Sequence, residues 1–198
     1  ATCHVARSLA RSNDIRDSPA HNIHSGLCNM SLFDREVAGR RAASAALQEY
    51  IGRIGGSRQE IYLPILTHVH FFSVASLEAS FTSNAVKIAS DLPSLIPAII
   101  EHLLEVSLIN FDRNVRQLAA DVLGKFYHYD PNLPRKLIQI YEKSDDLFAM
   151  HGSLLAMAAL PCEPSPLIIS ISIQSNSISP KALGAELLLE GFLKLISS

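Results

Sequence analysis

The chain has 198 residues, of which 48% are hydrophobic and 18% charged, and its formal net charge is −2. That length is sufficient for a sizeable core. No stretch reaches the roughly 18 uninterrupted apolar residues that a membrane-spanning helix needs, so no membrane span is expected. The 17 basic and 19 acidic residues are interspersed, which argues against binding of nucleic acid and favours a protein partner.

The N-terminal half shows the periodicity of paired helices. Apolar spacing predicts helices over residues 1–11, 22–33, 35–54 and 77–90. A polar loop is expected over 12–20, and Gly55 with Gly56 is expected to end the third helix. Residues 67–75, THVHFFSVA, are interpreted as a short irregular connection. The buried stripe of the fourth helix is predicted to be Phe81, Ala85, Val86 and Ala89.

The C-terminal half continues the pattern. Asp91 is predicted to cap a helix over 93–108, because aspartate caps helices and Pro93 suits a first turn. Further helices are predicted from the turn at Asn110 and Asp112 to about residue 129, from DPNLP to about 143, and from SDD to about 160. Three prolines then predict an irregular linker over 161–180, before a last helix over 181–196.

One helical motif occurs twice. RRAASAAL begins at Arg40 and RQLAADVL at Arg116, and each carries two small residues three and four positions on and a leucine seven positions on. An aspartate precedes each copy, at Asp34 and Asp112. The arginines are 116 − 40 = 76 residues apart, which is twice 38 and predicts one intervening unit of about the length of HEAT and armadillo repeats.

These patterns predict an all-α protein, an α-solenoid of HEAT/armadillo-like helical hairpins. Residues 1–198 are expected to form a single array, an excerpt of a longer solenoid, because the chain lacks an initiating methionine and begins with helical spacing. A hairpin cannot bury its apolar face alone, so neighbouring hairpins must pack together. Small residues are expected at the closest contacts, and these are Ala42, Ala43, Ser44, Ala45, Ala46, Ala119 and Ala120.

Signals for catalysis or metal binding are sparse. His21 with His24, and His68 with His70, lack a nearby acidic or cysteine ligand at zinc-like spacing. The three cysteines are far apart and odd in number, which fits a reducing compartment rather than a disulfide framework. The phosphate-binding, nucleophile-elbow and zinc-protease motifs do not occur. Ser153 lies on a predicted helix, so we expect neither a catalytic residue nor a cofactor.

The charged residues of the first motif offer the best candidates for partner contact. Arg35, Arg41, Glu49 and Arg53 follow one another on a predicted helix of alternating charge, which is either a solvated face or a partner-binding one. Arg40 and Arg116 could instead reach back to the preceding aspartates or to a neighbouring repeat. Such arginine ladders hold solenoids together.

Several segments resemble the tubulin-folding cofactor D (tubulin-specific chaperone D) family. The first is LFDREVAGRRAASAALQEYIGRIG at 32–55, and the second is IPAIIEHLLEVSLINFDRNVRQLAADVLGKF at 96–126. DLFAMHGSLLA at 146–156 and KALGAELLLEGFLKLISS at 181–198 are also similar. The chain departs from the family pattern at Met150, where an arginine is usual, and over 161–180.

The resemblance implies a cytoplasmic, microtubule-associated HEAT-repeat chaperone. Such a protein captures β-tubulin and helps assemble or disassemble the α/β-tubulin heterodimer, together with other tubulin cofactors and an Arl-family small GTPase. GTPase activation would then belong to the larger assembly. The alternative is a general HEAT-repeat scaffold, such as a transport or phosphatase adaptor, although such proteins would match FDREVAGRRAASAALQE only at its small-residue and leucine positions.

Overall fold

The computed structural model describes residues 23–54 and 62–161. Within these ranges every regular element is a helix, so the predicted all-α class is confirmed. The expected features at 1–11, 12–20, Gly55–Gly56 and 181–196, and all but the first residue of 161–180, lie outside the described residues. The chain divides into two compact units, 1–102 and 103–198, which are treated separately below.

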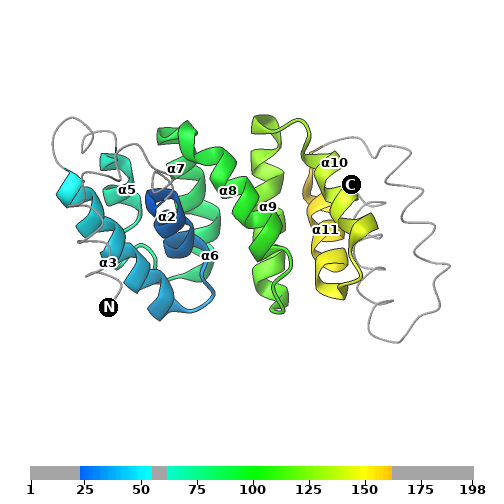
Figure 1. Cartoon of the computed structure of the whole chain (residues 1–198), viewed down its shortest axis with the longest axis horizontal. Helices are drawn as coiled ribbons and strands as arrows, with labels where there is room; N and C mark the ends of the chain where they lie inside the picture. The colour runs from blue at the N-terminus through cyan, green and yellow to red at the C-terminus, as the bar shows by residue number, and fades with distance from the viewer. Residues whose placement is uncertain (1–22, 55–61, 162–198) are drawn as a thin grey trace. The chain divides into compact units, whose positions relative to one another are not determined.

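The first unit begins with the predicted hairpin and continues with shorter helices. Its elements are α2 (Ile23–Phe33), α3 (Val37–Ile54), α5 (Leu63–His68), α6 (Leu77–Ala79), the π-helical η3 (Ser80–Asn84), α7 (Ala85–Asp91), the 3₁₀ turn η4 (Pro93–Leu95) and α8 (Ile96–His102). α2 and α3 lie side by side, and α2 also packs on η3 and α8 (Figure 1). The hairpin predicted over 22–54 is therefore confirmed.

Small side chains line the buried face of α3, but fewer of them than predicted. Ala43, Ser44 and Ala46 are buried, whereas Ala42 and Ala45 are exposed. The expectation was wrong for these two because a run of five consecutive residues covers all sides of an α-helix, and only about half of them can face one neighbour.

Residues 77–91 form one helical run, as predicted for 77–90. Phe81, Ala85 and Ala89 are buried, but Val86 is half-buried and Ile88 is buried in its place. Ile88 follows Phe81 by seven residues, close to two helical turns, so both share a face. Val86 follows by five residues and lies on nearly the opposite side.

Two details around α5 differ from expectation. Residues 63–68 form the short helix α5, with Pro64 in its first turn, where only an apolar segment was anticipated. The irregular connection is therefore shorter, at residues 69–76. The prediction that Asp91 caps the following helix was wrong. Leu92 is the residue before η4, and no side chain caps that turn. The Asp91 carboxylate instead pairs with His68 at 2.9 Å.

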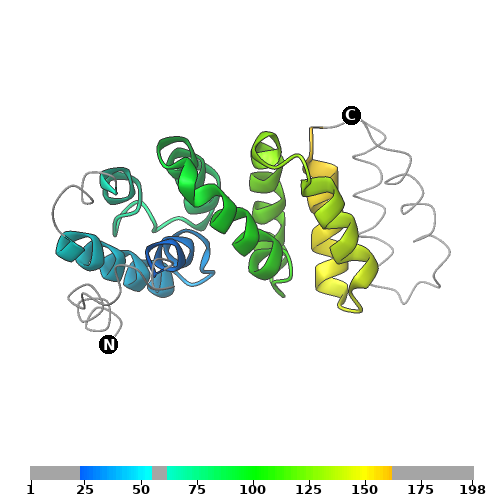
Figure 2. The same ribbon diagram turned by 45° about the horizontal axis from the view of Figure 1, so that its top comes forward.

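The described part of the second unit contains the helices predicted from the turn at Asn110 and Asp112 to about residue 160. Its elements are the π-helical η5 (Leu103–Ser107), α9 (Arg113–Phe126), the 3₁₀ turn η6 (Tyr127–Tyr129), α10 (Leu133–Lys143) and α11 (Leu147–Ala159). α11 packs on both α9 and α10, which lie beside it in Figure 2. Ala119 and Ala120 on α9 are fully buried, as the close-contact hypothesis predicted.

Glycine permits the closest approach in this unit. A Cβ atom at Gly152 of α11 would collide with the Leu108 carbonyl oxygen, and it would lie 2.9 Å from the Leu108 carbonyl carbon. A Cβ at Gly124 of α9 would likewise collide with the carbonyl oxygen of Ala159, 3.1 Å from its carbon. Backbone atoms cannot move aside as a flexible side chain can, so the spacing between α9 and α11 requires glycine at Gly124, and the approach of α11 to Leu108 requires glycine at Gly152.

Candidate interaction surfaces

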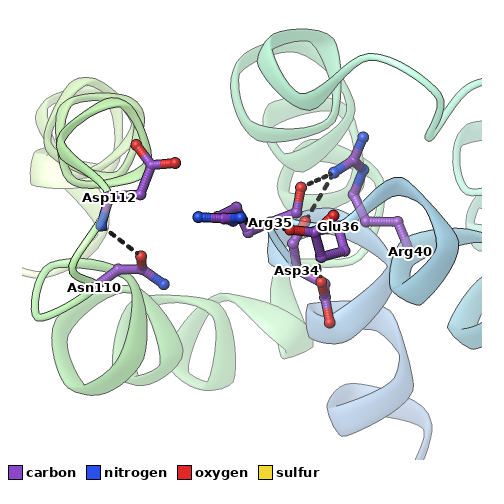
Figure 3. Close-up of polar contacts among 6 residues, drawn as sticks. All are labelled: Asp34, Arg35, Glu36, Arg40, Asn110 and Asp112. Atoms are coloured by element: carbon purple, nitrogen blue, oxygen red, sulfur yellow. Dashed lines mark hydrogen bonds and ion pairs between the residues drawn. The ribbon is translucent and has the colours of Figure 1, made fainter.

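A buried arginine joins two segments of the first unit. Arg40, only 2% exposed, donates Nη1 to the carbonyl oxygens of Asp34 and Arg35, both at 2.9 Å (Figure 3). On its other side Nε donates to Val74 O at 2.8 Å, and Nη2 to Ala75 O at 2.9 Å. One guanidinium therefore ties the turn before α3 to the connection before α6.

Arg116 repeats this arrangement in the second unit. Its Nη1 donates to the carbonyl oxygens of Asn110 and Phe111, at 2.6 and 3.0 Å. Its Nε donates to Nδ1 of His151 on α11, at 3.0 Å. The guanidinium also lies over the Phe148 ring, 5.1 Å from its centroid. Nδ1 of His151 thus takes the place of the Val74 and Ala75 carbonyl oxygens that Arg40 binds. Each arginine also binds two carbonyl oxygens of the turn before its own helix.

The turns show which residues of the two copies correspond. Oδ1 of Asp34 accepts from the backbone N–H of Glu36 at 2.7 Å, and Oδ1 of Asn110 accepts from that of Asp112 at 2.9 Å (Figure 3). Asp34 therefore corresponds to Asn110, 76 residues on, and not to Asp112 as the sequence comparison assumed. Asp112 has a different task, because its carboxylate caps α9 by accepting from the Asn114 N–H at 2.9 Å.

Both arginines are structural cations. Burial lowers the pKa of Arg40 and Arg116, and the carboxylates of Asp34 and Asp112 oppose that shift. Arginine nevertheless stays protonated in proteins, so each site buries a positive charge that carbonyl dipoles and a nearby carboxylate stabilise. The predicted structural role is confirmed, and neither guanidinium lies on a surface that a partner could reach.

The predicted partner-binding residues occupy three different settings. Arg35 lies in the turn before α3, rather than on the helix as expected, and its Nη2 pairs with Glu36 at 2.7 Å. Glu49 and Arg53 form an ion pair at 2.9 Å, one turn apart on α3. Exposed pairs of this kind contribute only about 0.3–0.5 kcal/mol. Arg41 is different, because it contacts the connection at 69–76.

The exposed aromatic residues of that connection were missed by sequence reasoning. The Arg41 guanidinium lies over the Phe71 ring, 4.2 Å from its centroid, and Nε donates to Phe71 O at 3.3 Å. Phe71 is 50% exposed and Phe72 is 78% exposed, with their ring centroids 5.4 Å apart. The adjacent FF in HVHFFSVA was the available signal. From the sequence it was interpreted only as part of a short irregular connection.

Hydrogen bonds fix the conformation of residues 69–76. Oγ of Ser73 donates to His68 O at 2.8 Å and accepts from the His70 N–H at 2.9 Å. The Asn84 amide donates to Ser73 O at 2.9 Å, and the Ser44 hydroxyl donates to Val69 O at 3.2 Å. Together with the Arg40 bonds, these contacts tie the connection to α3 and η3. The two phenylalanines are therefore presented on a well-held segment.

Of the residues considered for metal binding or catalysis, His21 lies outside the described residues, whereas His68, His70 and Ser153 have ordinary structural surroundings. His68 pairs with Asp91, and Nδ1 of His70 accepts from the Phe72 N–H at 3.3 Å. No three potential ligands gather around a metal-sized space in the part of the chain that the structure describes. Ser153 is fully buried and its hydroxyl donates to Met150 O at 2.9 Å. None of the described helices has the length and apolarity to cross a membrane.

Helical hairpins with small-residue contacts and a repeated buried arginine define a helical-repeat protein of the HEAT/armadillo class. Residues 1–61 match a family profile described as tubulin-specific chaperone D-like, ARM repeats. This match and the observed helices confirm the predicted α-solenoid class.

Two curated relatives agree with that match. The chain is 33% identical over 187 residues to tubulin-specific chaperone D of Dictyostelium discoideum, which covers 90% of the chain and 12% of that protein. It is 33% identical over 89 residues to tubulin-folding cofactor D of Schizosaccharomyces pombe, covering 45% of the chain and 8% of the relative. No solved structure matches. The resemblance to the tubulin-specific chaperone D family, indicated by the motifs, is thus confirmed.

Proposed function

We propose that this chain is a section of a tubulin-folding chaperone of the helical-repeat class. It helps capture β-tubulin and assemble or disassemble the α/β-tubulin heterodimer, together with other tubulin cofactors and an Arl-family GTPase, in the cytoplasm and in association with microtubules. The observation that carries the proposal is the similarity to tubulin-specific chaperone D across 90% of the chain. The chain spans only about a tenth of that relative's length, so the activity belongs to the whole protein.

The physical role of this section is binding rather than chemistry. Arrays of helical hairpins hold folded clients through many moderate contacts spread over a large area. Arg35, Arg41, Glu49 and Arg53 are the proposed contact residues. Any stimulation of GTP hydrolysis would come from the complete assembly, which positions the nucleotide and its activating groups.

Affinity purification of the full-length protein, followed by quantitative mass spectrometry, tests the client. We expect tubulin and an Arl-family GTPase among the enriched proteins. Enrichment of transport or phosphatase components without tubulin would overturn the proposal in favour of a general scaffold.

Charge reversal tests the contribution of this section. Arg41→Glu combined with Arg53→Glu reverses the charge of a half-buried and an exposed side chain of α3, and we expect it to reduce the tubulin retained per molecule of chaperone. Lys125→Glu combined with Lys143→Glu, at exposed positions of α9 and α10, reverses the same number of charges and is the matched control for net charge. Equal retention by the double variant and the control would contradict a contact at α3.

A further inference from the structure

The exposed connection and α3 together present the residue types of a binding hot spot, namely Phe71, Phe72 and Arg41. Aromatic residues and arginine dominate such hot spots, particularly when they are held rigidly before binding. Phe72 exposes 78% of its surface, although its backbone belongs to a segment bound by Ser73, His70 and Arg40. Partner binding would therefore order few additional side chains.

The two segments that carry this patch contain no acidic residue. Residues 37–48 of α3 contain Arg40 and Arg41 but no acidic residue, and residues 69–77 contain no aspartate, glutamate, lysine or arginine. Among the described residues Arg41 has no carboxylate partner, and its guanidinium contacts the Phe71 ring and the Phe71 carbonyl oxygen. Its Nε is committed to Phe71 O, which leaves Nη1 and Nη2 to bind a carboxylate in the two-pronged geometry that arginine favours.

The second copy of the motif provides an internal comparison. Leu147 and Phe148 lie 76 residues after Phe71 and Phe72, and they are also exposed, at 74% and 44%. Gln117 occupies the position of Arg41 in that copy. The cation over the Phe148 ring is Arg116, which is buried, so the second pair has an apolar surface without an accessible cation.

We propose that Arg41, Phe71 and Phe72 form a docking site for a segment of a protein partner that carries a carboxylate beside an apolar side chain. The carboxylate binds the outer nitrogens of Arg41, and the apolar side chain packs on Phe72. Complementary charge selects the acidic group, and the exposed ring supplies the apolar contact. That the partner is tubulin rests on the proposed function, whereas the chemistry of the site does not.

Binding of a defined probe tests the site. The full-length protein is titrated into a dye-labelled peptide of alternating glutamate and leucine, or into its glutamine counterpart, and fluorescence anisotropy is recorded. We expect Phe72→Ala to weaken binding of the glutamate peptide by roughly 5- to 30-fold. Arg41→Gln is expected to remove the preference for glutamate over glutamine, since it retains polarity but lacks the charge.

Leu147→Ala is the matched control, because it removes an apolar side chain of similar exposure, 74% against 78% for Phe72, from the corresponding pair of the second copy. We expect its effect on binding to be less than about twofold, within the range of peripheral contacts. Arg41→Lys keeps the charge without the planar fork and should bind with intermediate affinity. An Arg41→Gln variant that still prefers glutamate, or an equal loss in Leu147→Ala, would overturn the proposal.

Purified tubulin separates this inference from the proposed function. Tubulin retained by the wild type but lost with Phe72→Ala supports both. If the wild type and Phe72→Ala retain tubulin equally, and neither prefers the glutamate peptide over the glutamine peptide, the docking site is refuted and the chaperone role remains supported. If the wild type prefers the glutamate peptide but does not bind tubulin, the docking site is supported and tubulin is refuted as its partner.

Discussion

Replacing Arg40 by methionine should loosen the connection at 69–76 while leaving α3 folded. Methionine has a similar length and no charge, so it fills much of the same space and removes the hydrogen bonds. Four backbone carbonyl oxygens lose a donor, two in the turn before α3 and two, on Val74 and Ala75, in the connection. The change therefore acts at the junction and not within a helix.

The expected cost follows from two opposing terms. An unsatisfied buried carbonyl costs about 1–3 kcal/mol, so four of them would cost several kcal/mol if none found a new donor. Removing the guanidinium also removes the penalty for burying a charge, which is itself several kcal/mol. We expect a net loss of about 2–4 kcal/mol in the free energy of opening the junction. At about 1.4 kcal/mol for each factor of ten, the open population rises roughly 30- to 1,000-fold.

Amide hydrogen exchange measured by mass spectrometry reports this opening within the full-length protein. Val74 and Ala75 donate their N–H groups to His70 and Phe72 carbonyls at 3.1 and 3.2 Å, so peptides spanning them should exchange faster in Arg40→Met. Arg41→Met, one residue along the helix, is the control and should leave exchange at Val74 and Ala75 nearly unchanged. Equal exchange in the wild type and Arg40→Met would refute the reasoning.

Two further predictions concern packing and pH. Gly152→Ala should lower the melting temperature strongly, because the added Cβ meets the backbone of Leu108. Gly26→Ala is the control, since its Cβ would have nothing within 4 Å, and it should be neutral or stabilising by up to about 1 kcal/mol. Equal melting temperatures of the two variants would contradict this prediction. Burial beside Phe33 lowers the pKa of His102, so the unfolded state binds the proton first and stability should fall as pH drops below about 6.5. His102→Phe should flatten that dependence in urea titrations between pH 7 and 5, and an unchanged slope would count against it.

Helix positions could be predicted wherever periodicity and capping agree. The boundaries of α9 and α11 follow from apolar spacing together with the caps Asp112 and Asp146, which accept from the second residue of each helix. α5 was missed because six residues are too few to show helical periodicity. Asp91 was misassigned since a residue that suits a helix cap also suits an ion pair, and the partner His68 is distant in sequence.

The candidate site was only partly predictable for a related reason. The sequence separated Arg40 from the surface arginines because Arg40 recurs at the head of a repeated motif. It did not reveal that Arg41 meets Phe71, since that contact joins residues 30 positions apart. Exposure of Phe72 was equally hidden, because a phenylalanine in an apolar segment is usually buried and no local pattern indicates otherwise.

Arg40 and Arg41 illustrate how one helix turn can serve structure and binding together. Consecutive residues on an α-helix point about 100° apart, so adjacent arginines must meet different surroundings. Arg40 faces inward and fixes the backbone at Val74 and Ala75, while Arg41 reaches Phe71 near the exposed end of the same connection. The residue that positions Phe72 is therefore inaccessible to a partner, whereas Arg41, the proposed contact residue, is only half-buried. The proposed docking site could consequently change through Arg41 and Phe72, while substitution of Arg40 is constrained by the backbone it holds.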